Sequence, residues 1–165
     1  MQLYLADVPH VTTSPTAAPP EFPLARVHEA IAAARPDDDC LVFRNRRFTW
    51  SEVTDRTRRL ANHLIGRGLG VRTERGALPG HESGQDHLAI YLHNGNEYLE
   101  SMLGALKARV VSLNVNYRYV AEELAYLLAD ADARAIVVHS CFTPTLAEVL
   151  PSLPHLDVIL QVPDD

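Results

Sequence analysis

The sequence predicts an α/β protein with a doubly wound, mostly parallel sheet, preceded by a helix and a β-hairpin. Two observations carry this prediction. From residue 87 onward, short apolar runs alternate with helical patterns in the order β-α-β-α-β-α-β. These apolar runs are also unbroken rather than alternating, which is typical of strands that helices cover on both faces. Parallel strands joined by helices in this way are connected by right-handed crossovers.

The N-terminal part of the chain is predicted to be a tail followed by a helix. Residues 1–23 are rich in Pro, Ser and Thr and have no apolar period, so we expect a disordered tail. Apolar side chains recur at helical spacing over residues 24–34, and Pro36 ends this helix. The acidic run Asp37-Asp38-Asp39 is interpreted as a solvated loop rather than a metal site.

A hairpin and an amphipathic helix are predicted next. Two short strand candidates, Cys40–Arg44 and Arg47–Trp50, flank Asn45-Arg46, which is the length of a tight turn. Thr49 and Glu52 have the spacing of a capping box. The helix that they begin has apolar side chains at helical spacing up to residue 64, which predicts one buried face.

The glycines that follow this helix bear on a possible nucleotide site. The segment Gly66-Arg67-Gly68-Leu69-Gly70 follows a helix rather than a strand and lacks the spacing of a dinucleotide-binding motif. We therefore interpret it as a helix stop rather than a phosphate cradle. Residues 69–86 form a long polar loop, and we expect residues 72–86, like residues 1–20, to be mobile and to be cut first by proteases.

The remaining chain is predicted to contain four strands and three helices. The predicted strands are His87–Leu92, Val110–Val115, Arg134–His139 and Asp157–Val162. The predicted helices are Glu97–Arg109, Ala121–Asp130 and Pro144–Leu150. Asn94 or Asn96 is expected to cap the first of these helices. Val110–Val115 and Ile136–Val138 are so apolar that both of their faces should be covered.

Several groups of polar and aromatic side chains resemble parts of binding or catalytic sites, but each also has a simpler structural explanation. The turn His93-Asn94-Gly95-Asn96 has the makings of an anion site at a helix N-terminus, but ordinary capping is the favoured interpretation. His81, His87 and His93 recur every six residues, which aligns them on neither a strand nor a helix. The run His81-Glu82-Ser83 has the residue types of a nucleophile and its base, but adjacency does not create triad geometry. Tyr117, Tyr119 and Tyr126 are expected to be half-buried packing residues.

The composition argues against a nucleic-acid-binding protein, a membrane-spanning protein and a disulfide-bonded protein. The chain has 165 residues, with 21 acidic and 15 basic side chains and a net charge of −6, which is a poor basis for nucleic-acid binding. No apolar run approaches the roughly 20 residues of a membrane span. Cys40 and Cys141 allow one disulfide, but two free thiols in a reducing cytoplasm are favoured because no signal peptide precedes them.

Two segments carry a resemblance to a known family. The first is Phe48-Thr49-Trp50-Ser51-Glu52-Val53, followed by Arg59-Leu60-Ala61-Asn62-His63-Leu64. The second is Gly104-Ala105-Leu106-Lys107-Ala108-Arg109-Val110-Val111-Ser112-Leu113-Asn114, followed by Asn116-Tyr117-Arg118-Tyr119 and residues 122–130. Over residues 24–162 the chain resembles the N-terminal part of ATP-dependent acyl-CoA synthetases of the adenylate-forming (AMP-binding) superfamily. It resembles bacterial fatty-acyl-CoA synthetases more than amino-acid-activating relatives.

The resemblance implies an activity for the family and a limit for this chain. Family members convert a carboxylic acid and ATP into an acyl-adenylate and then an acyl-CoA, using Mg²⁺ and CoA. Their phosphate loop, adenine and ribose motifs, hinge and catalytic Lys have no counterpart in these 165 residues. Residues 24–165 are thus expected to be an incomplete synthetase domain with no catalytic, cofactor-binding or metal-binding residue and no ligase activity. Arg109 and Ser112 also depart from the Gly and Pro of many relatives.

Two interpretations of the chain remain open at this point. It is either the N-terminal sheet layer of a fatty-acyl-CoA synthetase, or a stand-alone α/β interaction or regulatory module derived from that scaffold. In the first case the sheet lacks its neighbours, so the chain is expected to associate with itself or with the rest of the enzyme. A third alternative, a nucleotide-binding domain of the flavodoxin or NAD type, lacks its glycine signature.

Overall fold

A computed structural model describes residues 23–164 of the chain. The helices are α1 (Leu24–Ala34), α2 (Trp50–Gly66), α3 (Asn96–Lys107), α4 (Ala121–Asp130) and α5 (Thr143–Val149). The strands are β1 (Asp39–Phe43), β2 (Arg46–Thr49), β3 (His87–Tyr91), β4 (Val111–Asn114), β5 (Ala133–His139) and β6 (Val158–Val162). Short 3₁₀ turns lie at Arg75–Ala77, Ser140–Phe142 and Leu150–Ser152. The order of elements is the predicted one.

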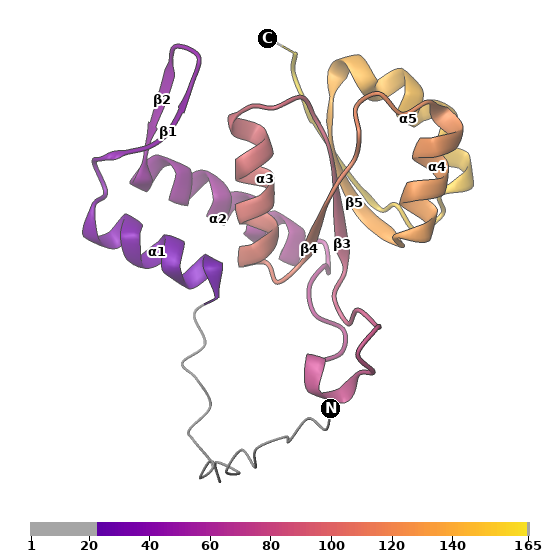
Figure 1. The fold of residues 1–165 in the computed structure, drawn as a ribbon, viewed down its shortest axis with the longest axis horizontal. Coiled ribbons are helices and arrows are strands. Elements are labelled where there is room, and N and C mark those ends of the chain that lie inside the picture. Colours follow the sequence, from indigo (N-terminus) through magenta and orange to yellow (C-terminus); the bar gives the residue numbers. More distant parts are fainter. Residues whose placement is uncertain (1–22, 165) are drawn as a thin grey trace, which may run out of the picture.

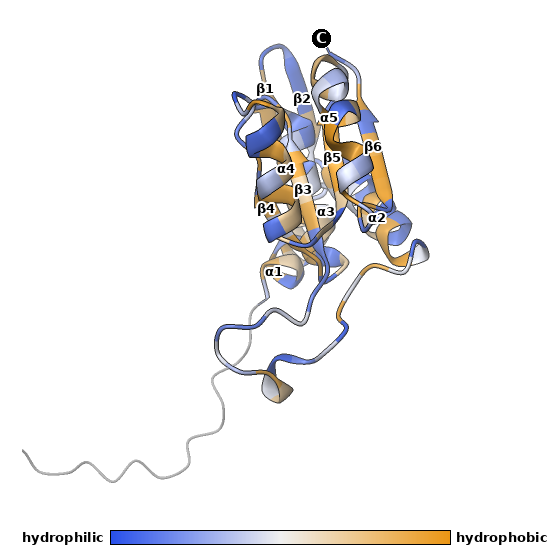
Figure 2. Cartoon of the chain, turned by 90° about the vertical axis from the view of Figure 1, so that its right-hand side faces the viewer, coloured by the Kyte–Doolittle hydropathy of each residue, from blue (hydrophilic) through white to orange (hydrophobic). Residues whose placement is uncertain are grey.

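Four parallel strands form the central sheet in the order β4-β3-β5-β6. The helices α1, α2 and α3 lie on one side of this sheet, and α4 and α5 lie on the other (Figure 1). The predicted doubly wound architecture is therefore confirmed. In Figure 2 the strands between the two helical layers are mostly apolar, as the unbroken apolar runs indicate.

Each face of the sheet has its own hydrophobic core. The core under α2 and α3 includes Leu64, Leu88 and Ile90, and the core under α4 and α5 includes Tyr91, Leu124 and Ile136. Alternate residues of β3 thus enter opposite cores, because successive side chains of a strand point to opposite faces. This explains why β3 is apolar at almost every position.

The hairpin and the start of α2 are close to the prediction, but the first strand and the turn, predicted at Cys40–Arg44 and Asn45-Arg46, each lie one residue earlier, and the start of α2 is also shifted. The strands β1 and β2 pair antiparallel, and their turn is Arg44-Asn45, with Arg44 at a φ of 51°. The predicted second strand included Trp50, which instead begins α2. The capping box explains the difference: Thr49 accepts from the Glu52 amide, and Glu52 accepts from the Thr49 amide 2.8 Å away, so the helix starts directly after Thr49.

Two further details of the helices and strands correct the predictions, and a third confirms one. The helix α3 ends at Lys107 rather than Arg109, because Arg109 has a φ of 57° and leaves the helix. Residues 111–113 of β4 are only half-buried, because β4 is an edge strand with no partner among residues 23–164 on its outer side. The side chains of Ile136–Val138 in the sheet interior are buried, as predicted.

The long loop before β3 contains more local structure than predicted. Val71 and Gln85 form an isolated antiparallel bridge, and the Arg75 guanidinium donates to the carbonyls of Pro79, Gly80 and Glu82. Whether residues 72–86 are mobile remains a prediction. Residues 1–20, for which mobility was also predicted, lie outside the described residues.

Candidate functional site

A cavity of about 300 Å³ lies where the carboxyl ends of the central strands meet the hairpin. The chain passes from β3 to β4 on one side and then crosses to β5 on the other side of β3, so the strand order reverses between β3 and β5. Ligands of open α/β sheets bind outside the carboxyl ends of the strands at such a point. The cavity is lined by Phe43, Arg44, His93, Asn94, Gly95, Glu97, His139, Cys141 and Asp164.

Two histidines come together at this edge of the sheet. His139 is the last residue of β5, and His93 follows β3 by two residues. The His93 amide donates to His139 Nδ1 at 3.0 Å, so we infer that a neutral His139 carries its proton on Nε2. The His93 ring centroid lies 4.8 Å from those of Tyr117 and Phe142. An aromatic wall thus surrounds the polar groups. The pairing of His93 with His139 was not predicted, because their spacing of 46 residues gives no signal in the sequence.

The first turn of α3 borders the same cavity, but the predicted asparagine cap is wrong. Gly95 is the N-cap residue, and no side chain of the described residues caps the helix. Asn96 is fully buried, and its Nδ2 donates to Glu100 Oε1 at 3.2 Å, so its amide group joins a network with Arg56 instead. The uncapped amides and the helix dipole favour an anion here. Glu97 and Asp164 also line the cavity, however, and their negative charge opposes a phosphate group.

No strong nucleophile is prepared at this edge. The pKa of the Cys141 thiol is raised, first by burial and then by its hydrogen bond with Asp164, so the thiol stays protonated at neutral pH. Asp164 itself accepts from Ser140 Oγ at 2.6 Å, which lowers the pKa of its carboxyl group. Both cysteines are free, in agreement with the interpretation favoured from the sequence.

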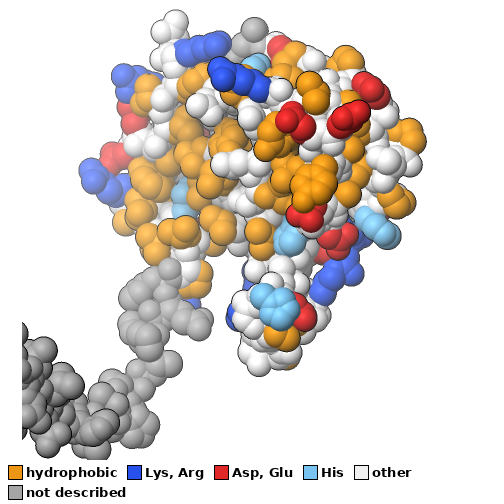
Figure 3. All heavy atoms as spheres, turned by 45° about the vertical axis from the view of Figure 1, so that its right-hand side comes forward, with side chains coloured by type: hydrophobic (Ala, Val, Ile, Leu, Met, Phe, Trp, Pro, Cys, Tyr) orange, Lys and Arg blue, Asp and Glu red, His pale blue; other side chains and the backbone are white. Residues whose placement is uncertain are grey.

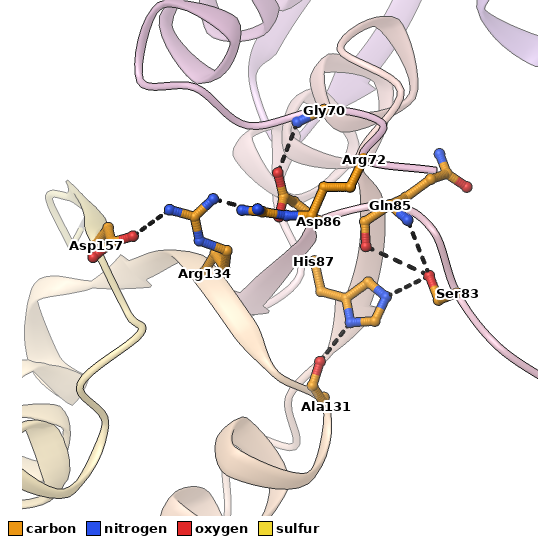
Figure 4. Close-up of polar contacts among 9 residues, drawn as sticks. All are labelled: Gly70, Arg72, Ser83, Gln85, Asp86, His87, Ala131, Arg134 and Asp157. Carbon is orange, nitrogen blue, oxygen red and sulfur yellow. Dashed lines mark hydrogen bonds and ion pairs between the residues drawn. The ribbon is translucent and has the colours of Figure 1, made fainter. Parts of the chain in front are cut away.

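The opposite, amino-terminal edge of the sheet holds a second polar cluster (Figure 4). Asp86 is 4% exposed and accepts from the Gly70 amide at 2.9 Å and from Arg72 Nε at 2.5 Å. Arg134 lies 3.4 Å from the same carboxylate and also binds Asp157. Burial alone would raise the pKa of Asp86, but Arg72, Gly70 and Arg134 hold it below its ordinary value. This cluster ties the loop to β3 and β5.

A serine and a histidine do meet at this edge, although not the adjacent pair of the sequence. Ser83 Oγ lies 2.9 Å from His87 Nε2, and the Nδ1 of the same ring bonds to the Ala131 carbonyl (Figure 4). Because a carbonyl only accepts, Nδ1 carries the proton and Nε2 accepts from the hydroxyl. Ser83 Oγ also accepts from the Gln85 amide at 3.4 Å, so the serine and the histidine hold this turn against the sheet.

The other sequence candidates are placed apart. Among residues 23–164 no group of three or more His, Cys, Asp and Glu side chains could hold a metal, and His81, His87 and His93 do not meet. The glycine segment is the predicted helix stop, with Gly68 at a φ of 80° and the Leu69 amide bonded to the Leu64 carbonyl. The prediction for the tyrosines is wrong for two of the three, since Tyr117 is 42% and Tyr126 is 72% exposed.

A larger cavity of about 450 Å³ lies on the side of the sheet that α1, α2 and α3 cover, between α1 and α2. Lys107, the only lysine of the chain, lies at its floor. This residue belongs to one of the family's scaffold motifs, and no cavity beside it was predicted from the sequence. No helix of the described chain is long and apolar enough to cross a membrane.

The chain is similar to acyl-CoA ligases in sequence. It is 50% identical over 144 residues to the medium-chain acyl-CoA ligase Mig of Mycobacterium avium, a match that covers 87% of this chain and 26% of that protein. It is 33% identical over 141 residues to a medium/long-chain-fatty-acid/3-oxocholest-4-en-26-oate CoA ligase of Mycobacterium marinum, covering 86% of this chain and 23% of that ligase. The chain thus spans about a quarter of the length of these relatives.

Solved structures and a family model agree with this similarity. A putative long-chain-fatty-acid CoA ligase of Rhodopseudomonas palustris superposes with a TM-score of 0.75 at 28% identity, over 88% of this chain and 34% of that one. The anthranilate CoA ligase AuaEII shares the fold with a TM-score of 0.75 at 21% identity, over 88% of this chain and 26% of that one. The model of the AMP-binding enzyme family matches residues 28–165. The chain therefore belongs to the AMP-binding enzyme family and corresponds to the N-terminal part of its acyl-CoA ligases.

Proposed function

We propose that this chain is the N-terminal scaffold segment of a fatty-acyl-CoA synthetase. The whole protein would join a carboxylic acid to ATP, giving an acyl-adenylate and pyrophosphate, and the CoA thiol would then displace AMP. The observation that carries the proposal is the 50% identity to a medium-chain acyl-CoA ligase over 144 residues. ATP, Mg²⁺ and CoA are thus cofactors and substrates of the whole protein, and the acid is expected to be a fatty acid.

The isolated chain is proposed to be inactive as a ligase. Adenylation needs cationic groups that stabilise the charge of the transferring phosphate. The charged side chains that line the carboxyl-end cavity are Arg44, Glu97 and Asp164, and the chain's one lysine lies in the other cavity. The scaffold instead supplies the strand ends and the aromatic wall around His93, next to which catalytic loops from elsewhere in the protein would sit.

The open edges of the sheet support the proposal that this chain pairs with further polypeptide. Within residues 23–164, β4 and β6 each have one edge without a neighbouring strand. Ile159 of β6 is 42% exposed, and residues 111–113 of β4 are half-buried. Open edges of apolar strands readily pair with other strands. We propose that residues 24–165 are one part of a larger domain, after a tail of residues 1–23, and that it acts in the cytoplasm, where its free cysteines stay reduced.

Pyrophosphate release tests this proposal. The purified chain is mixed with ATP, Mg²⁺, CoA and a panel of fatty acids of increasing chain length, and the rate is compared with that of a control without protein. We expect no turnover above the control. Turnover that depends on the added acid would show that the chain is a complete ligase. It would overturn the proposal that the catalytic groups lie elsewhere in the whole protein.

The alternative, a stand-alone interaction or regulatory module, has one observation in its favour. Both faces of the sheet already bury a hydrophobic core of their own. A chain with two such cores has the means to fold without further polypeptide. The state of association of the chain in solution therefore separates the two candidates.

A further inference from the structure

The pair of Ser83 and His87 at the amino-terminal edge of the sheet is the feature from which we draw a further inference. His87 is the first residue of β3, and Ser83 lies four residues before it in the loop. Both are separate from the carboxyl-end cavity, which lies at the other end of the strands. The histidine that Ser83 meets is thus fixed to the sheet and is not the neighbouring His81 of the loop.

The ring of His87 is held so that it can take a proton from Ser83. Its Nδ1 bonds to the Ala131 carbonyl, which only accepts, so a neutral ring carries its proton on Nδ1. Nε2 therefore keeps its lone pair, and Ser83 Oγ lies 2.9 Å from it (Figure 4). A hydroxyl, a base within hydrogen-bond reach and a third group that orients the base are the pattern of an activated nucleophile.

The hydroxyl of Ser83 is accessible and has an electron pair left. Ser83 is exposed, whereas His87 is half-buried. The single hydroxyl hydrogen is donated to His87 Nε2, and the oxygen accepts from the Gln85 amide at 3.4 Å. A hydroxyl oxygen has two lone pairs. One of them is therefore free to attack an electrophile.

The residue after Ser83 is a glycine with an unused amide. The Gly84 carbonyl accepts from the Arg72 and Thr73 amides at 2.7 and 3.0 Å, and a Cβ atom at this position would overlap the Thr73 carbonyl. The Gly84 amide itself makes no hydrogen bond within residues 23–164. In α/β-hydrolases the amide of the residue after the nucleophile helps to stabilise the oxyanion. Gly84 is placed in sequence to supply the same kind of donor.

A cavity of about 300 Å³ in the loop, here called the loop cavity, borders Ser83. This volume is at the lower limit of the range for cavities that bind small ligands. Its charged lining residues are Glu74, Arg75, Glu82 and Arg109, so the charges balance. Arg109 pairs with Glu74 at 2.8 Å, and Arg75 donates to three backbone carbonyls. The loop cavity therefore suits a small group without charge.

We propose that Ser83 and His87 cleave small, uncharged carboxylic esters. Ser83 Oγ attacks the carbonyl carbon while its proton passes to His87 Nε2, and the Gly84 amide donates to the developing oxyanion. The ester C–O bond then breaks, and the alcohol leaves with the proton from His87. Water, deprotonated by the same imidazole, hydrolyses the acyl-serine and restores the free hydroxyl.

This activity does not depend on the proposed ligase function, because none of the carboxyl-end residues takes part in it. It needs neither ATP nor CoA, so an assay without nucleotide separates the two. Failure of one proposal would leave the other standing.

Reaction of the full chain with p-nitrophenyl acetate and with a fluorophosphonate tests the proposal. We expect release of p-nitrophenolate and an acetyl group on the Ser83 peptide of the quenched reaction. The fluorophosphonate should modify the same hydroxyl with loss of fluoride. Ser83→Ala, at an exposed position, is expected to fold and should abolish both reactions. His87→Gln should slow both by about 100-fold or more, since a positioned base contributes about 10²–10⁴-fold.

His81→Gln is the matched control for the loss of a histidine. His81 belongs to the same loop, its side chain is 84% exposed, and its Nε2 lies 3.9 Å from Glu82, so this variant should react like the parent chain. The proposal is overturned if neither reagent modifies Ser83, or if His87→Gln and His81→Gln react at the same rate. It is also overturned if Ser83→Ala releases p-nitrophenolate as fast as the parent chain, because a histidine would then attack the ester directly.

Discussion

At the scale of single residues, two side chains in the helical layer are held in unfavourable states. Arg109 follows the C-cap of α3 in the left-handed region, with a φ of 57°, a conformation that glycine adopts more readily than arginine. His28 of α1 is 7% exposed, and neither of its ring nitrogens has a hydrogen-bond partner among residues 23–164. Neither residue contributes to the carboxyl-end cavity. Both therefore allow stability to be changed without altering that cavity.

Arg109→Gly should stabilise the chain by about 1 kcal/mol, because glycine adopts the left-handed region without strain. The ion pair between Arg109 and Glu74 is fully exposed and contributes little. Arg109→Ala removes the same ion pair but keeps the strain. Urea unfolding of both variants should show the glycine variant to be more stable than the alanine variant. Equal stabilities would show that the backbone at this position is not strained.

His28 should make the chain less stable in mild acid. Burial lowers its pKa, and the positive charges of Lys107 and Arg58 lower it further. As the pH falls below about 6.5, the unfolded chain binds a proton that the folded chain does not, so the free energy of unfolding decreases. His28→Leu should remove this part of the pH dependence and, by removing an unsatisfied polar group, stabilise the chain by about 1 kcal/mol.

Urea unfolding between pH 5 and pH 7.5 measures this effect. His63→Leu is the control, because His63 is exposed on α2. The explanation is contradicted if His28→Leu leaves the same slope of stability against pH as the parent chain.

At the scale of elements, the packing of α2 on α3 depends on one close approach. A Cβ atom at Gly104 would lie 2.6 Å from Leu60 Cδ2 and 3.0 Å from Leu60 Cβ. The same two helices are joined by Arg56, whose guanidinium donates to both carboxylate oxygens of Glu100 at 2.8 Å. Close packing and a half-buried ion pair thus fix α3, and with it the first turn that borders the carboxyl-end cavity.

Gly104→Ala should destabilise the chain by about 1–2 kcal/mol, because the clash with Leu60 outweighs the gain in helix propensity. In a Leu60→Ala background the same substitution should cost less, because the contacts with Leu60 Cδ2 and Cγ are gone and only the 3.0 Å approach to Cβ remains. Gly66→Ala is a control, because a Cβ there meets nothing within 4 Å. Thermal unfolding of the four variants decides this. A stabilising effect of Gly104→Ala in the parent chain would contradict the packing described here.

The elements themselves were largely predictable from the sequence, for a physical reason. Strands covered on both faces have unbroken apolar runs, and the capping box of α2 is local, so residues 49–52 specify the start of that helix without help from the rest of the chain. The cap of α3 was mispredicted because the partner of Asn96 is Glu100, whose carboxylate is held in place by Arg56 of another helix. Contacts made across helices override the local preference of an asparagine.

The candidate sites were less predictable than the elements. His93 and His139, or Asp86 and Arg134, become neighbours only after parallel strands align in register. Their separations of 46 and 48 residues carry no periodic signal. The cavity beside Lys107 is lined by residues of three helices, α1, α2 and α3, which come together only in the folded chain. What the sequence did allow, through the family motifs, was the recognition of the scaffold.

At the scale of the whole molecule, the main feature is a parallel sheet whose two edge strands, β4 and β6, are open to further strands. Both helical layers lie over the sheet, as the ribbon in Figure 1 shows, while the outer edges of β4 and β6 have no strand beside them in the described chain. Apolar side chains also reach the surface shown in Figure 3. Large apolar side chains that are exposed in the described chain include Val120, Tyr126 and Ile159. These features are typical of a surface that pairs with more polypeptide.

Sedimentation velocity of the purified chain at micromolar concentration tests whether the open sheet edges pair with further polypeptide. We expect dimers or larger species, and we expect Ile159→Lys, a charge on the open edge of β6, to shift the distribution toward monomer. Ala147→Lys on α5, a comparable charge away from the strand edges, is the control. A single sharp monomer that also unfolds cooperatively on heating would contradict the proposal that the sheet edges need a partner. It would favour a stand-alone module.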